Sequence, residues 1–439
     1  METTTTKRAL GPFEAIRDLT YDAPFPRLLP VRRHVDAPEE ADPAGAAAAA
    51  LEPLRERITP GMSVAITAGS RGIHDIATVV RATGDWLRAA GAEPFVVPAM
   101  GSHGGATAEG QRDVLAHLGV TEATMGMPIR ATMDTVEVGR CDDGPAVHLD
   151  ANAAQADGIV LVNRIKPHTD FHGEVESGLA KICAIGLGKR QGAEGIHVYG
   201  SEGLARWVPE VARHIIATGK VLGGLAILEN AFEHTARIAF LDVAEIGAAG
   251  ETKLLEEARS LMGRLPFDDL DVLVVDELGK DKSGSGMDTN IIGRMMIRGT
   301  AEFDRPRITN VTVHDISEAS NGNAVGIGLA DFIPFRVLEK IDLRAMYVNA
   351  VTSGIGGVQR GQLPLAMPTD RDTIAAAMLM CGRADVANSR LVRIHDTLDT
   401  VDLLVSESLR DEVERADDLE LLDKGAPMSF DASGALHPW

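Results

Sequence analysis

The residues from 166 to 197, KPHTDFHGEVESGLAKICAIGLGKRQGAEGIH, hold an unusual concentration of side chains that could do chemistry. They include the histidines His168, His172 and His197 and the lysines Lys181 and Lys189. A histidine can accept and return a proton near neutral pH, and a lysine buried among apolar residues can act as a nucleophile or a covalent anchor. The alternative is a solvated loop followed by a glycine-containing helix, in which these side chains have no chemical task and the lysine stems reach solvent.

Three other places combine glycines with reactive side chains, and each follows a segment that is expected to be a strand. They are Ser70 and Arg71 in AGSRG, His103 in GSHGG, and Lys280 in the loop from Gly279 to Arg294. An arginine can hold a carboxylate through two parallel hydrogen bonds, which suits an anionic substrate of an acidic protein. Taken singly, His103 is more typical of a turn than of a catalytic base. Because the carboxyl ends of parallel strands meet at one edge of a sheet, these residues could nevertheless line one pocket.

Two familiar kinds of site are not predicted in the 166–197 stretch. His197 could bind a metal ion, but no second histidine, cysteine or carboxylate lies at a usual metal-binding spacing from it, so a protein-only metal cage is not expected. The segment GLGKRQG departs from the phosphate-binding pattern, because Cys183 replaces the first glycine and Arg190 follows the lysine. No GxGxxG motif opens a helix after a strand, so a standard dinucleotide fold is not expected either.

The pattern of apolar residues predicts the elements that would position these side chains. The runs 63–67, 93–99 and 158–165 are typical of buried strands, and residues 75–90 of an amphipathic helix. This strand–helix–strand order favours a parallel sheet. Further strands are expected at 222–229, 235–243, 270–277 and 308–315, with helices at 201–217, around 328–348 and at 370–381. Residues 1–42 lack periodicity and are expected to wrap the surface or to form an edge strand.

Length and composition indicate two α/β domains with mainly parallel sheets. A chain of 439 residues is long enough for more than one core, and its low aromatic content of 4% suits α/β layers. We expect residues 1–265 to carry the catalytic and cofactor-anchoring residues and residues 266–439 to close over the cleft. The active site, together with the 279–294 loop, is expected in the interdomain cleft.

Charge and cysteine content exclude several classes of partner. A net charge of −21 argues against nucleic acid, which needs a surplus of lysine and arginine. Cys141, Cys183 and Cys381 are too few and too widely spaced for a disulfide framework or a zinc knuckle, so the cytoplasm is the expected compartment. The start of the chain lacks a signal-peptide core, and no apolar run reaches the roughly 18 residues that a membrane helix needs. No membrane partner is expected.

Four segments together resemble the nickel-dependent lactate racemase family, whose members racemise or epimerise 2-hydroxy acids with a nickel-pincer nucleotide. AMGSHGGATAEG resembles the family's G-x-H-R-x-x-T segment and KPH its proline–histidine pair. ESGLAKICAIG resembles the Gly-Gly-Arg-Lys segment, whose lysine is Lys181 here. His197 follows this lysine by 197 − 181 = 16 residues and is similar to the family's protein ligand to nickel.

The resemblance implies an isomerase with a defined cofactor. Lys181 would bind the nickel-pincer nucleotide (pyridinium-3,5-bisthiocarboxylic acid mononucleotide nickel) covalently, and His197 would bind its nickel, the cofactor supplying the other three donors. His103 and His168 would act as acid and base on opposite faces of a small hydroxy acid, lactate-like or larger, while a hydride moves reversibly to the cofactor. Cofactor-synthesis enzymes would be needed for maturation.

The resemblance also assigns residues to the substrate. Arg71 is similar to the arginine of the family's T-R-P turn and would hold the substrate carboxylate; Ser70 beside it and Lys280 are assigned to the substrate as well. Two departures point to a divergent branch with another substrate: Gly104 stands where the family has arginine, and three extra residues separate His168 from Lys181.

Two other functions fit the same residues. One is a cofactor-free isomerase in which His103 and His168 abstract and return a proton next to a carboxylate. The other is a metallocofactor-binding protein without catalytic activity. Deuterium at the reacting carbon distinguishes the enzymes, because hydride transfer retains the label and proton abstraction loses it to solvent.

Overall fold

The computed structural model describes residues 12–70 and 72–439, and its chain divides into two compact units. The first, which we call the central unit, is Asp36–Met262. The second, the terminal unit, combines Gly263–Trp439 with the described residues up to Val35. The sequence predicts a single boundary after residue 265, whereas the structure adds one at Val35. The reason is strand β1 (Arg27–Arg33), which pairs antiparallel with three strands of the terminal unit.

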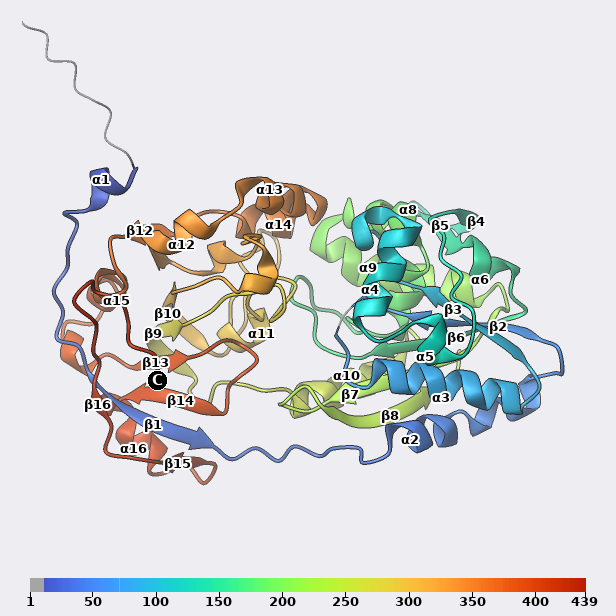
Figure 1. Ribbon diagram of the computed structural model, residues 1–439, viewed down its shortest axis with the longest axis horizontal. Coiled ribbons are helices and arrows are strands. Elements are labelled where there is room, and N and C mark those ends of the chain that lie inside the picture. Colours follow the sequence, from blue (N-terminus) through green and yellow to red (C-terminus); the bar gives the residue numbers. More distant parts are fainter. Residues whose placement is uncertain (1–11, 71) are drawn as a thin grey trace, which may run out of the picture. The chain divides into compact units, whose positions relative to one another are not determined.

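The central unit is built on a mainly parallel sheet, as the strand–helix–strand order predicts (Figure 1). In the described part of the chain it has five strands in the order β3-β2-β6-β7-β8, of which β8 is antiparallel to its neighbour and the others are parallel. Their bounds are Ser63–Ala68 for β2, Glu93–Pro98 for β3, Gly158–Arg164 for β6, Val221–Glu229 for β7 and Thr235–Leu241 for β8.

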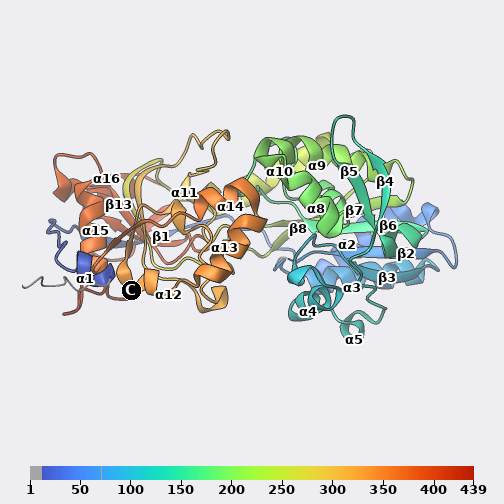
Figure 2. The same cartoon turned by 90° about the horizontal axis from the view of Figure 1, so that it is seen from above.

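Helices cover both faces of this sheet, which explains why its strands are apolar almost throughout. Helices α2 (Pro43–Ala50) and α3 (Ile76–Ala89) cover one face, and α9 (Gly200–Ile216) and α10 (Ala249–Leu261) the other, as Figure 2 shows. Neighbouring residues of β2 point to opposite cores: Val64 belongs to the first and Ala65 to the second. The carboxyl ends of β2, β3 and β6 therefore share one edge of a sheet that is buried on both faces.

The other elements of the central unit are short and lie around this sheet. Strands β4 (Thr135–Arg140) and β5 (Ala146–Asp150) form an antiparallel hairpin. The segment after β6 runs through α7 (Leu179–Lys181), a π-helical turn (Ile182–Gly186) and α8 (Lys189–His197). The remaining helices are the 3₁₀ turns Glu52–Arg57 and Gly104–Ala106 and the α-helices α4 (Ala108–His117), α5 (Glu122–Met125) and α6 (Ala151–Gln155).

The terminal unit contains a larger mixed sheet. Within the described residues its order is β12-β11-β10-β9-β13-β14-β1-β15, with β16 also paired to β1. The strands from β12 to β13 are parallel, and those from β14 onward extend the sheet in antiparallel fashion. Their bounds are β9 Asp269–Val275, β10 Arg307–Val313, β11 Phe332–Pro334, β12 Leu365–Met367, β13 Leu391–Ile394, β14 Asp402–Ser406, β15 Leu419–Leu421 and β16 Ala426–Pro427. Strand β1 thus lies inside the sheet and not at its edge, contrary to the expectation for residues 1–42.

The helices of this unit include one correction. The helix expected around 328–348 is divided into strand β11, helix α12 (Phe335–Lys340) and helix α13 (Leu343–Thr352). Helix α12 begins after Pro334, and the carboxylate of Asp342 accepts the amides of Arg344 and Ala345 at 2.8 and 3.0 Å, which starts a new helix. The other helices are α1 (Pro12–Ile16), α11 (Thr289–Ile292), α14 (Gly354–Arg360), α15 (Asp370–Leu379) and α16 (Arg410–Val413), with 3₁₀ turns at Glu318–Ser320, Ile327–Leu329, Val386–Asn388 and Glu407–Leu409.

In residues 12–70 and 72–439 we find no helix with the combined length and apolar character needed to cross a membrane. Cys141, Cys183 and Cys381 are buried as free thiols.

Candidate active site

Ser70 and His103 meet at the carboxyl ends of β2 and β3. The two strands are paired along their whole length, up to Ala68 and Pro98, so the loops that follow them start side by side. The hydroxyl of Ser70 and Nδ1 of His103 are hydrogen-bonded. Arg71, the proposed ligand of the substrate carboxylate, lies outside the described residues.

The buried side chain of Gln111 holds the loop that carries His103. The Nε2 amide of Gln111 donates to the carbonyl oxygen of Gly101 at 2.9 Å and to that of His103 at 3.4 Å. The amide of Gly101 donates to the carbonyl of Gly186 at 3.3 Å, which joins this loop to the π-helical turn. The imidazole of His103 is exposed, but its backbone is fixed at two points.

Gly104, which replaces the family's arginine, has a backbone that excludes any side chain. Its φ is +65°, in the left-handed region, and a Cβ there would lie 2.4 Å from the carbonyl carbon of Gly110. Helix α4 passes too close to this position for an arginine, so the departure is built into the path of the loop.

His168 follows β6, and its ring is fixed on two sides. The backbone amide of Asp170 donates to Nδ1 at 2.9 Å, and the ring centroid lies 4.5 Å from that of Phe171, with the rings tilted by 35°. Because Nδ1 accepts a hydrogen bond, it carries no proton, and a neutral ring has its hydrogen on Nε2. His168 therefore starts as a hydrogen-bond donor through Nε2.

The longer segment between His168 and Lys181 folds around the buried carboxylate of Glu176. This carboxylate accepts the backbone amide of His168 at 2.5 Å, pairs with Nδ1 of His172 at 3.2 Å and accepts a guanidinium hydrogen of Arg259 at 2.5 Å. The extra residues thus form a support for His168. His172 belongs to this support.

Lys181 ends helix α7, and a second buried carboxylate fixes the start of that helix. Glu251 of α10 accepts the backbone amide of Ala180 at 3.1 Å and that of Gly247 at 2.8 Å. Burial raises the pKa of Glu251, although these amide hydrogen bonds oppose the rise. A side chain on Gly178 would collide with the carboxylate, since a Cβ there would lie 2.1 Å from Oε1.

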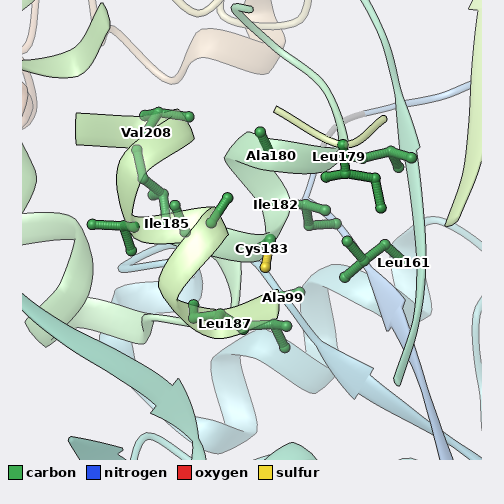
Figure 3. Close-up of a cluster of buried hydrophobic side chains, with 14 of the residues drawn as sticks. Ala99, Leu161, Leu179, Ala180, Ile182, Cys183, Ile185, Leu187 and Val208 are labelled. Carbon is green, nitrogen blue, oxygen red and sulfur yellow. The ribbon is translucent and has the colours of Figure 1, made fainter. Parts of the chain in front are cut away.

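The π-helical turn after Lys181 packs firmly against the end of the sheet. Figure 3 shows Ile182, Cys183 and Ile185 among buried apolar side chains, including Ala99 at the end of β3 and Leu161 of β6. A Cβ on Gly69 would lie 3.8 Å from Cδ1 of Ile182, so the loop after β2 reaches the same turn. Single π-helical turns inside α-helices are frequent at functional sites. Here the turn is the contact point of the loops after β2 and β3.

His197 ends helix α8 with a defined protonation pattern. Its Nδ1 donates to the carbonyl oxygen of Ala193 at 2.6 Å, which leaves the lone pair of the neutral ring on Nε2. Burial lowers the pKa of His197, the Ala193 hydrogen bond opposes this, and the positive charge of Lys181 lowers the pKa further. The negative charge of Asp170 raises the same pKa.

The contacts of the central unit bring Ser70 and His103 together and join the loop of His103 to the π-helical turn that follows Lys181. His168 is held by the amide of Asp170, and His197 ends the helix that follows the same turn. Lys280 lies in the terminal unit, after β9, where its ammonium donates to the carbonyls of Gly284 and Val325 at 2.8 and 3.0 Å. Its assignment to the substrate, like the interdomain cleft, stays a prediction.

Sequence reasoning missed the buried residues that support the site, namely Gln111, Glu176 and Glu251. Glu251 stands in the first turn of an amphipathic helix, where exposed acidic residues are common, and nothing in the sequence marks it as buried. Glu176, between Val175 and an apolar segment, carries a weak signal: a lone carboxylate in apolar surroundings needs partners.

Comparisons with known proteins find only distant structural likenesses. No family model matches the chain, and no curated protein matches it significantly. Among solved structures it is similar to a structural-genomics protein from Thermotoga maritima, with a TM-score of 0.46 and 12% identity over 73% of this chain and 83% of that one. It is also similar to the lactate racemase apoprotein from Thermoanaerobacterium thermosaccharolyticum, with a TM-score of 0.48 and 10% identity over 85% of this chain and 99% of that one. Both TM-scores lie below 0.5, so the function has to be argued from the site.

Proposed function

We propose that the protein is a racemase or epimerase of a hydroxy acid that works with a nickel-pincer nucleotide. The observation that carries the proposal is that the loop of His103 is hydrogen-bonded, from the Gly101 amide to the Gly186 carbonyl, to the π-helical turn that directly follows Lys181. An amine for covalent attachment, an imidazole for the metal and two imidazoles for proton transfer are the groups that this chemistry needs.

The residues present fit the cofactor. Lys181 would hold it covalently, and His197 would bind nickel through Nε2, because its Nδ1 is used by the Ala193 carbonyl. Histidine ligands commonly donate their other ring hydrogen to a backbone carbonyl in this way. In the described part of the chain no group of three or more His, Cys, Asp or Glu is arranged to hold a metal ion, so His197 is proposed as a single protein ligand. When bound, the cofactor supplies a hydride acceptor, and its attachment requires the enzymes that make it.

His103 is the residue best prepared to act as a base. The hydrogen bond to Ser70 allows either tautomer of His103; in the proposed mechanism Nδ1 donates its hydrogen to the hydroxyl, and the ring presents the lone pair of Nε2 to the substrate. It can then take the proton of the substrate hydroxyl while the C–H bond of the carbinol carbon breaks and the C=O bond forms. Ser70 thus holds the base in the useful tautomer.

His168 starts in the opposite state. Its hydrogen on Nε2 can be donated to the substrate oxygen from the other face, while Nδ1 is held by the amide of Asp170. To act as a base at Nε2, the ring must take up a hydrogen at Nδ1, and the contact with Asp170 must open. For His168 to become the base and His103 the acid, the turn from His168 to Asp170 must therefore open.

The substrate is proposed to be a hydroxy acid held by Arg71, with Lys280 as a second contact. Gly104 stands where the family has an arginine, which removes one positive charge beside His103. We take this departure as a sign of a hydroxy acid other than lactate, for example a larger one or a sugar acid.

The test uses protein produced together with the cofactor-synthesis enzymes and a panel of hydroxy acids deuterated at the carbinol carbon. The proposal predicts inversion with the label retained in the product and no turnover by Lys181→Ala. Inversion with loss of the label would instead establish the cofactor-free proton route. Attachment at Lys181 without inversion of any panel member would favour the binding protein.

A further inference from the structure

Lys189 is a buried charged residue that the proposed chemistry does not use. Its side chain is fully buried, and it is the first residue of α8. Its φ of +53° lies in the left-handed region, which strains any residue other than glycine. A lysine in this conformation and at this depth needs strong compensation from its contacts.

The ammonium group of Lys189 makes two hydrogen bonds and one ion pair. It donates to the carbonyl oxygen of Pro98 and, at 3.1 Å, to Oε1 of Gln111, and it lies 3.0 Å from Oδ2 of the equally buried Asp150 without hydrogen-bond geometry. Burial lowers the pKa of Lys189, and the charge of Asp150 opposes this. A buried ion pair is weak evidence for stability, because desolvation offsets its attraction. Its use is better sought in the geometry that it fixes.

The contacts of Lys189 join the supports of two site residues. Gln111, which accepts from Lys189, donates in turn to the carbonyls of Gly101 and His103. Helix α8, which Lys189 begins, ends at His197. Asp150 ends β5, next to which α8 packs (Figure 1). One ammonium group therefore ties the loop of His103 to the helix of His197.

We propose that Lys189 is a positioning residue that sets the place of His103 relative to His197, acting on His103 through Gln111. The roles of the two histidines rest on the proposed function, whereas their coupling through Lys189 does not. The network predicts an order of effects: loss of the Gln111 amide loosens His103 alone, and loss of the Lys189 ammonium loosens both His103 and His197.

The test measures the reactivity of single histidines toward diethyl pyrocarbonate by peptide mass spectrometry, on protein without cofactor. The variants are Lys189→Met and Gln111→Glu, which replaces the donating amide by an oxygen and keeps an acceptor for Lys189. The matched control is Glu109→Gln, an exposed position on the same helix. His117 at the end of α4 and His34 in the terminal unit serve as internal references.

The expected result is selective. In Gln111→Glu, His103 reacts about two- to tenfold faster, as the loss of one hydrogen bond to its loop implies, while His197, His117 and His34 keep their rates. In Lys189→Met, His103 and His197 both react faster, and Glu109→Gln resembles the wild type. Unchanged reactivity of His103 in Gln111→Glu would overturn the proposal. Faster reaction of every histidine in both variants would overturn it as well, since the network would then only stabilise the fold.

A kinetic measurement on loaded protein completes the test. We expect Gln111→Glu to keep its nickel and its KM and to lose about 100-fold in kcat, because a misplaced base fails mainly in the transition state. Equal losses in kcat and in nickel content would contradict a role through His103. If the wild-type protein binds no nickel and inverts no hydroxy acid, the proposed function fails, while the histidine reactivities still decide the role of Lys189.

Discussion

The hydroxyl of Ser70 is hydrogen-bonded to Nδ1 of His103, although the two residues follow different strands of the central unit. The contact exists because β2 and β3 are parallel neighbours in register, so that their carboxyl ends place the two loops together. It gives the exposed imidazole of His103 a fixed partner, and in the proposed mechanism it selects the tautomer.

Replacing Ser70 by alanine tests this contact. We expect Ser70→Ala to lower kcat of the loaded enzyme by about 10- to 100-fold, the usual cost of removing the partner that orients a functional imidazole. Thermal stability should not change, because Ser70 is only partly buried. The control is Ser102→Ala, which removes an exposed hydroxyl from the loop of His103 and should keep the wild-type kcat. Equal kcat values for the two variants would remove Ser70 from the mechanism.

Glu176 should matter for both folding and activity. Glu176→Gln removes the negative charge that faces Arg259 and one of the strong acceptors of the His168 loop, so we expect a loss of about 1–3 kcal/mol in unfolding free energy and a lower kcat. Urea denaturation and steady-state kinetics measure these effects. Glu174→Gln, exposed two residues earlier, should change neither. A wild-type denaturation curve for Glu176→Gln would show that the buried carboxylate does not organise this loop.

The close approach of Gly178 and Glu251 predicts that two glycine-to-alanine substitutions have different effects on stability. In Gly178→Ala the new methyl group meets Oε1 of Glu251, and displacing this buried carboxylate should cost about 1–3 kcal/mol. In Gly195→Ala the methyl group meets only Cβ of Pro145 at 3.9 Å, and the stability should stay the same or rise by about 0.4–1 kcal/mol. Thermal unfolding of the two variants checks this, and similar midpoints would contradict the packing around α7.

The stability of the terminal unit should depend on pH through Asp370. Burial opposes ionisation of this carboxyl, but the hydrogen bond and charge of His314, the amide of Leu436 and the charge of Arg336 outweigh it and hold the pKa at about 2. The folded pKa lies below the unfolded pKa of about 3.9. The contribution of Asp370 to the unfolding free energy is therefore complete above about pH 3.9 and is lost as the pH falls toward 2. The loss should be about 2 kcal/mol.

Denaturant unfolding between pH 5 and pH 2 measures how the unfolding free energy depends on pH. The slope should correspond to about one titrating group. Asp370→Asn should flatten the curve, whereas Asp411→Asn, an exposed aspartate of the same unit, should not. A wild-type slope in Asp370→Asn would assign the acid sensitivity to other carboxyl groups.

Much of the fold could be predicted from the sequence because local patterns determine it. The strands at 63–67, 93–99 and 158–165 are apolar on both faces, as strands in a covered parallel sheet must be, and the structure confirms the parallel sheet. The prediction of a helix around 328–348 was wrong, because its apolar residues belong to a short strand and two helices. The breaks between them depend on Pro334 and Asp342. The place of β1 inside the sheet of the terminal unit depends on long-range pairing, which no local pattern encodes.

The reactive residues of the candidate site can be proposed from the sequence, whereas their supports appear only in the structure. Histidines and lysines after strands are visible in a sequence, and so is the spacing of Lys181 and His197. The buried contacts of Gln111, Glu176 and Lys189 are not, because an acidic, amide or basic residue looks the same in sequence whether it is buried or exposed. Arg71 lies outside the described residues, so its role stays a prediction.

The central claim is that Lys181 carries a nickel cofactor whose metal binds His197. Its most direct test is intact mass and nickel analysis of protein made together with the cofactor-synthesis enzymes, for the wild type, Lys181→Ala and His197→Ala. The account predicts a covalent mass increase on Lys181 with bound nickel in the wild type, neither in Lys181→Ala, and the mass increase with weakened nickel binding in His197→Ala. A wild-type protein with no added mass and no nickel under these conditions would contradict it.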